Sequence, residues 1–146
     1  MPGSKSDLVI VDSDALIGLL NPADSNHSRY LEISEYLSKN SLETVVPYPI
    51  ILEAATALSR NTKINRPDLA LQLLDNYAKT EDKPKLDEEV ALLTSQSFKK
   101  TTSRKNTPFD HYLLALAKKN GIRYIFSFDT FYKSRGLIPA DNLLKK

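Results

Sequence analysis

The sequence contains no cysteine, and none of its apolar runs approaches the length of a membrane span. Without cysteine, neither a disulfide nor a thiolate metal site can form, which fits the reducing cytosol. The first residues, Met-Pro-Gly-Ser-Lys-Ser-Asp, lack the apolar segment of a secretion signal. No repeat, low-complexity tract or interdomain linker is evident. We therefore expect one soluble domain covering residues 1–146, located in the cytoplasm and without a membrane partner.

Charge is distributed unevenly along the chain, although the formal net charge is only +2. Residues 1–90 hold nine basic and 15 acidic residues, a balance of −6. Residues 91–146 hold 11 basic and three acidic residues, a balance of +8. Such a division can indicate a polyanionic partner, and a solvated basic surface explains it equally well.

Short apolar runs alternate with longer helical stretches. The predicted strands are Leu8–Val11, Thr44–Val46, Tyr124–Phe128 and, more weakly, Pro84–Leu86. The predicted helices lie near Ser28–Ser38, Pro49–Ser59, Pro67–Lys79, Glu88–Lys99 and Pro108–Asn120. Strands separated by helices predict an α/β fold, a three-layer α/β/α sandwich around a short, mainly parallel sheet. In such sheets ligands bind beyond the carboxyl ends of the strands.

Acidic residues stand where two of these strands end. Asp12 follows Leu-Val-Ile-Val directly, Asp14 comes two residues later, and Asp129 follows Tyr-Ile-Phe-Ser-Phe. Taken singly, each is better explained as a helix N-cap, because Asp is among the best capping residues.

Two further acids lie on apolar helix faces. Glu53 shares a face with Ile50, Ala54 and Leu58 in the least polar helix, where a carboxylate is costly unless a cation or donors meet it. Asp110 has two readings of equal weight, because it completes a capping box with Thr107 and also lies on the face expected to pack on the sheet.

The acidic residues are more informative taken together than singly. Two acids at strand ends and two near helix starts would converge at one edge of a parallel sheet. Carboxylates at such short distances repel one another unless a cation lies among them. Oxygen ligands of this kind suit Mg²⁺ or Mn²⁺.

These segments resemble the PIN-domain family. The resemblance rests on Val-Ile-Val-Asp-Ser-Asp-Ala-Leu from residue 9, the helix carrying Glu53, Asp-His-Tyr-Leu-Leu-Ala-Leu-Ala from residue 110, and Ile-Phe-Ser-Phe-Asp-Thr-Phe from residue 125. The resemblance extends from about Leu8 to Phe131. A single-domain PIN protein of this size is most similar to the VapC-type toxins of toxin–antitoxin pairs.

The resemblance implies a divalent-metal endoribonuclease that cuts single-stranded or looped RNA, with Mg²⁺ or Mn²⁺ as cofactor. The acids that match the family's four are Asp12, Glu53, Asp110 and Asp129. Asp14 is an additional candidate ligand. Ser127 matches a small hydroxyl residue two positions before the last acid and could orient a ligand or bind the substrate phosphate; a plain hydroxyl at a strand end explains it equally well. The family also implies a homodimer and an antitoxin partner. The apolar stripe of Pro67–Tyr77 could serve either contact, although core packing is the commoner explanation.

Four basic residues just before Asp110 could hold the RNA backbone; they are Lys99, Lys100, Arg104 and Lys105. The alternative is a solvated helix end and loop. His111 is adjacent to Asp110, but we interpret it as a surface or capping residue and assign it no role.

Three other readings stay open. Asp12-Ser-Asp14 after a strand also resembles the first motif of haloacid-dehalogenase-like phosphohydrolases, yet no convincing later Lys or Gly-Asp motif follows. A receiver domain would carry Lys where Asp129 stands. A PIN-like module that binds RNA or protein without cutting is the non-enzymatic alternative.

Overall fold

The computed structural model describes residues 8–79, 87–100 and 105–145. Its centre is a four-stranded sheet in the order β2-β1-β3-β4, with all three strand pairs parallel. The strands are β1 (Leu8–Val11), β2 (Glu43–Val45), β3 (Tyr124–Phe126) and β4 (Ile138–Pro139). The first three confirm the predicted strands to within one or two residues. Strand β4 was not predicted, and the weak candidate Pro84–Leu86 lies outside the described residues.

In the described residues, six α-helices and two short 3₁₀ helices connect and follow the strands. They are α1 (Ser13–Leu20), α2 (His27–Lys39), α3 (Tyr48–Arg60), α4 (Pro67–Ala78), α5 (Glu88–Lys99), α6 (Pro108–Lys119), η2 (Lys133–Arg135) and η3 (Ala140–Leu144). Proline stands at the first or second position of α3, α4 and α6, where its missing N–H costs nothing. Gly121, with a φ of 65°, ends α6 in the left-handed conformation.

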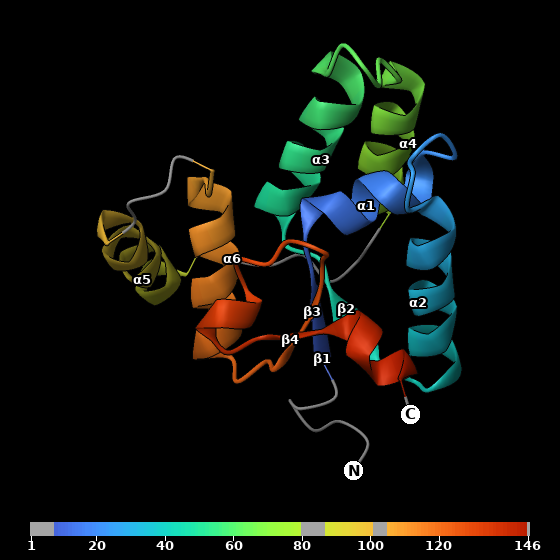
Figure 1. Ribbon diagram of the computed structural model, residues 1–146. Helices are drawn as coiled ribbons and strands as arrows, with labels where there is room; N and C mark the ends of the chain where they lie inside the picture. The colour runs from blue at the N-terminus through green and yellow to red at the C-terminus, as the bar shows by residue number, and fades with distance from the viewer. Residues whose placement is uncertain (1–7, 80–86, 101–104, 146) are drawn as a thin grey trace.

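Both faces of the sheet are covered, as the continuous apolar run of β1 predicts. Ile10 packs into a core with Leu113 and Ile125, on the side of α6. Its neighbours Val9 and Val11 point the other way, into a core with residues of α2 and η3. Figure 1 shows these helices on opposite sides of the strands. The predicted α/β/α arrangement is therefore confirmed.

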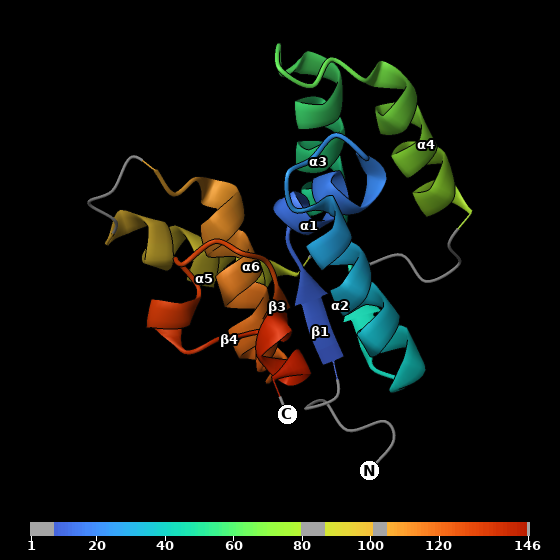
Figure 2. The same ribbon diagram turned by 45° about the vertical axis from the view of Figure 1, so that its right-hand side comes forward.

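A third core lies beyond the carboxyl ends of the strands. Helices α3 and α4 pack against each other through Ala54, Leu58, Leu69 and Leu73, with residues of α1 beside them. In Figures 1 and 2 this helical pair and α1 stand past the tip of β1. The edge of the sheet where the acids were expected is therefore overhung by α1 and α3. Among the described residues, no helix is both long and apolar enough to cross a membrane.

Candidate active site at the carboxyl edge of the sheet

Asp12 is the innermost of the acids and is 3% exposed. It ends β1 and caps α1, because its Oδ1 accepts a hydrogen bond of 2.7 Å from the backbone N–H of Ser13. Its Oδ2 accepts from the hydroxyls of Tyr132 at 2.8 Å and Ser127 at 3.3 Å. Burial, together with the charges of Asp14 and Asp110, raises the pKa of Asp12 to about 7. The capping role is thus real and leaves the second oxygen directed at the site.

Asp14 lies in the first turn of α1 and uses only one of its two oxygens. Its Oδ2 accepts from the hydroxyl of Tyr30 at 2.8 Å and from the backbone N–H of Phe128 at 2.9 Å. Its Oδ1 is buried and has no hydrogen-bond partner among the described residues. Burial raises the pKa of Asp14, and the charge of Asp129 adds to that effect. A buried carboxylate oxygen without a donor is costly, so this atom is available to a cation.

Glu53 comes from α3 and points back toward the same region. Its Oε1 is buried and lacks a partner in the part of the chain that the structure describes. Burial raises the pKa of Glu53, the charges of Asp110 and Asp14 raise it further, and a hydrogen bond with Ser13 opposes them. The influence of two other acids on Glu53 indicates that all three share one region.

Asp110 is 8% exposed at the start of α6 and combines both predicted roles. The capping box with Thr107 is present, and its Oδ2 accepts from the backbone N–H of Thr107 at 2.9 Å. Its Oδ1 lies 3.2 Å from the hydroxyl of Tyr132. One oxygen therefore caps the helix while the other faces the centre of the site.

Tyr132, like Tyr30, is a site residue that the sequence did not reveal. Its side chain is fully buried and its hydroxyl lies between Asp12 and Asp110. A hydroxyl carries a single hydrogen, so it cannot donate fully to both carboxylates at once. Burial and the two adjacent acids raise the pKa of Tyr132 well above its usual range. The neutral hydroxyl thus joins two carboxylates that would otherwise repel each other.

Ser127 and Asp129 complete the edge at the end of β3. Ser127 donates to Asp12 Oδ2, and its Oγ accepts from the backbone N–H of Asp129 at 3.1 Å. Asp129 Oδ1 accepts from the backbone N–H of Phe131 at 2.9 Å and so stabilises the turn after the strand. The charge of Asp129, which is half-buried, contributes to the raised pKa of Asp14, so the two carboxylates lie near each other.

The donor set fits a hard divalent cation. In the described ranges, no group of three or more His, Asp or Glu residues has an arrangement ready to hold a metal ion. Nevertheless, carboxylates from α1, α3, α6 and the two strand ends face one region, and two of their buried oxygens have no donor among the described residues. Carboxylate oxygens are what Mg²⁺ and Mn²⁺ bind.

The described basic residues lie at the end of α5 and in the segment just before α6. Lys99, Lys100 and Lys105 are exposed, whereas Arg104 lies outside the described residues. The interpretation of His111 as a surface or capping residue is wrong, because its side chain is only 1% exposed. Helix α5 packs along α6 and covers the face that carries His111. Burial and the charge of Arg135 lower the pKa of His111, although Asp110 opposes this.

Comparison with known proteins agrees with the fold described above. The family model of the PIN domain matches residues 9–135. The crystal structure of VapC20 from Mycobacterium tuberculosis, a sarcin-ricin loop cleaving toxin, superposes with a TM-score of 0.73 at 16% sequence identity, covering 89% of this chain and 96% of that chain. A search of curated proteins finds no matching sequence. The match argues against the haloacid-dehalogenase and receiver readings, and the chain belongs to the PIN-domain family.

Proposed function

We propose that this protein is a divalent-metal-dependent endoribonuclease that hydrolyses phosphodiester bonds in single-stranded or looped RNA. The observation that carries the proposal is the acidic cluster, to which Asp12 brings a carboxylate from the end of β1. Asp14, Glu53 and Asp110 bring carboxylates from α1, α3 and α6. Burying several like charges is unfavourable unless a cation compensates them. Membership of the PIN-domain family supports the same chemistry.

Asp12 and Asp110 are the proposed direct ligands of Mg²⁺ or Mn²⁺. One oxygen of each carboxylate contacts the hydroxyl of Tyr132, so the two oxygens lie on either side of the same point. Glu53 and Asp129 complete the shell directly or through water, and Asp14 is a further candidate through its buried Oδ1. When bound, the cation supplies an activated water and neutralises charge on the scissile phosphate. Ser127 orients Asp12 by donating to its Oδ2.

The biological role we propose is that of the toxin of a type II toxin–antitoxin pair, acting in the cytoplasm. VapC20, a toxin that cleaves the sarcin-ricin loop, shares the fold over almost its whole length. A homodimer and an antitoxin complex need apolar surface. Leu52 on α3 and Leu71 on α4 provide it, being 42% and 59% exposed.

Lys99, Lys100 and Lys105 are proposed contacts to the RNA backbone, with Arg104 between them in sequence. If they bind phosphates, RNA affinity falls steeply as salt rises. Affinity that is flat in salt and unchanged when the four residues are neutralised would reject this part.

The proposed activity is tested by incubating the purified protein with end-labelled RNA in Mg²⁺, in Mn²⁺ and in EDTA. Cleavage in either metal and none in EDTA is expected, without hydrolysis of p-nitrophenyl phosphate. Hydrolysis of the small ester instead would favour a phosphohydrolase. Metal-independent RNA binding without cleavage would favour the non-catalytic binding module.

A further inference from the structure

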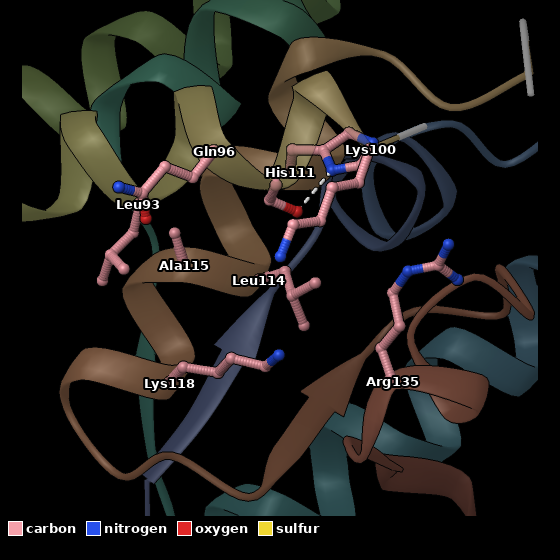
Figure 3. Close-up of a pocket in the computed structure, with 9 residues that line it drawn as sticks. Leu93, Gln96, Lys100, His111, Leu114, Ala115, Lys118 and Arg135 are labelled. Atoms are coloured by element: carbon pink, nitrogen blue, oxygen red, sulfur yellow. Dashed lines mark hydrogen bonds between the residues drawn. The ribbon is translucent and has the colours of Figure 1, made fainter. Parts of the chain in front are cut away.

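A cavity of about 310 Å³ lies between α5, α6 and η2 (Figure 3). Its apolar floor includes Leu93, Leu114 and Ala115. Three basic side chains, Lys100, Lys118 and Arg135, form its rim. In Figure 3 the amino groups of Lys100 and Lys118 lie on either side of Leu114 of α6, and Arg135 lies to one side of them, on η2. The guanidinium of Arg135 lies over the ring of Phe131. We call this cavity the α5–α6 pocket.

The three cations of the α5–α6 pocket are not neutralised by acids. Within the described part of the chain, none of them forms an ion pair with a carboxylate. Arg135 donates to the carbonyl of Phe131 and the hydroxyl of Ser134, at 3.3 and 3.0 Å. By contrast Lys119, next to Lys118, is paired with both Asp87 and Glu89. Like charges gathered around one concavity repel each other, so an anion bound there is stabilised.

A buried imidazole lines the same cavity. The Nδ1 of His111 is hydrogen-bonded to the hydroxyl of Ser97 at 2.7 Å. Its Nε2 is buried and has no partner among the described residues. A buried polar atom without a partner costs free energy, which a ligand or a small side-chain movement would recover. The pocket therefore combines uncompensated positive charge with an unsatisfied polar group.

The pocket is physically connected to the acidic cluster. Phe131 packs edge-on against the ring of His111, with centroids 5.0 Å apart, and against the ring of Tyr132 at 5.1 Å. The hydroxyl of Tyr132 in turn touches Asp12 and Asp110. Asp110 and His111 are also consecutive residues of α6. Buried ring contacts through Phe131 and Tyr132 therefore link a wall of the α5–α6 pocket to the acidic cluster.

We propose that the α5–α6 pocket binds one nucleotide of the RNA substrate, with Lys100, Lys118 and Arg135 holding its phosphate and the apolar floor contacting its base. This inference rests on the proposed ribonuclease function. A volume of about 310 Å³ lies at the small end of ligand pockets, which suits a single nucleotide better than a folded protein segment. Phosphate is the anion that several Lys and Arg side chains bind together.

The first test measures RNA affinity in an Asp12→Asn background, so that binding is observed without cleavage. The double variant Lys118→Gln/Arg135→Gln should raise the Kd about tenfold at low salt. It should also reduce the slope of log affinity against log salt by about 0.7 for each phosphate that is no longer neutralised. The matched control is Arg60→Gln/Lys63→Gln, which removes the same charge from exposed positions around the end of α3. Equal affinity in the pocket and control variants would overturn the proposal.

The second test needs neither RNA nor metal. Adenosine 5′-monophosphate should shift the His111 ring signals in NMR spectra of the wild type but not of the double variant, and adenosine should not shift them. Equal shifts with adenosine would refute phosphate recognition. A polyglutamate peptide that shifts the signals when the nucleotide does not would indicate an acidic protein segment and overturn the RNA assignment.

The two hypotheses fail in different ways. If the wild type does not cleave RNA in any metal, the proposed function fails, and the nucleotide titration still decides what the pocket binds. If the wild type cleaves RNA but the double variant binds and cleaves it equally well, only the pocket assignment is wrong.

Discussion

Asp110 and His111 are consecutive residues of α6, and both are buried, yet their surroundings are opposite in charge. On one side, burial and neighbouring acids raise the pKa values of Asp12, Asp14 and Glu53. On the other, burial and Arg135 lower the pKa of His111. Each side contains buried polar atoms that find no partner among the described residues. One step along a helix thus separates a region suited to a cation from a region suited to an anion.

The two sides also differ in how firmly their charged groups are held. The acids receive hydrogen bonds from buried tyrosine and serine hydroxyls and from backbone N–H groups. The cations of the α5–α6 pocket are exposed side chains with few partners in the described ranges. We therefore expect changes on the acidic side to affect chemistry and stability, and changes on the basic side to affect affinity.

The largest expected effect is on catalysis. Asp110→Asn should reduce RNA cleavage about a thousandfold or more, because losing the cation removes several kcal/mol of transition-state stabilisation. The measurement is single-turnover cleavage of labelled RNA in Mg²⁺. The fold should survive, since Asn can still accept the capping bond of α6. Asp75→Asn, an exposed position on α4, is the matched control. Full activity in Asp110→Asn would remove this residue from the site.

The next effect is a pH dependence of the metal-free protein. Because the pKa of Asp12 is raised from 3.8 to about 7, the folded state binds more protons than the unfolded state between these values. The stability should therefore fall as pH rises from about 4 to 7 and then level off, by up to about 4 kcal/mol from this group. The raised pKa values of Asp14 and Glu53 act in the same direction. Urea unfolding in EDTA across this range measures the trend.

Asp12→Asn should flatten that dependence and stabilise the metal-free protein at pH 8, whereas Asp75→Asn should change neither. A wild-type stability that rises steadily from pH 4 to 8 would contradict the electrostatic description of the acidic side.

A smaller effect is expected at Tyr132. Tyr132→Phe keeps the buried ring but removes the hydroxyl that joins Asp12 and Asp110. The metal-free protein should lose about 1.5–3 kcal/mol, as for hydrogen bonds to charged groups. Mg²⁺ should then raise the Tm of the variant more than that of the wild type, because the cation replaces a missing partner. Equal Mg²⁺ shifts in both proteins would show that hydroxyl and cation do not compete.

The smallest effect lies on the basic side. Ser97→Ala removes the hydrogen bond between the Ser97 hydroxyl and the His111 ring and should cost about 1 kcal/mol. The ring signals of His111 in NMR should move, while cleavage at saturating RNA stays close to wild type. A large loss of maximal cleavage rate would mean that His111 takes part in the chemistry.

Much of the fold was predictable because its signals are local. Leu8–Val11 is a continuous apolar run rich in β-branched residues, and Pro67 and Pro108 stand at helix starts. Strand β4 escaped prediction because two residues, one of them proline, show no periodicity.

The site was predictable only in part. The acids could be identified because a carboxylate on an apolar helix face is energetically costly unless a cation or hydrogen-bond donors compensate it. Tyr132 looks like an ordinary core aromatic, and its role depends on a contact with Asp12 across 120 residues of sequence. Lys118 and Arg135 look like ordinary surface cations until η2 is placed opposite α6. His111 was assigned to the surface because no local pattern reveals that α5 covers it.

The most direct measurement is a crystal structure of the protein with Mn²⁺, examined by anomalous scattering. We predict an ion among Asp12, Glu53 and Asp110, with carboxylate oxygens about 2.0–2.2 Å from it, as for other small divalent ions. The hydroxyl of Tyr132 should then no longer join Asp12 and Asp110. An empty acidic cluster at millimolar Mn²⁺, in a protein that cleaves RNA equally well in EDTA, would contradict the metal-dependent mechanism.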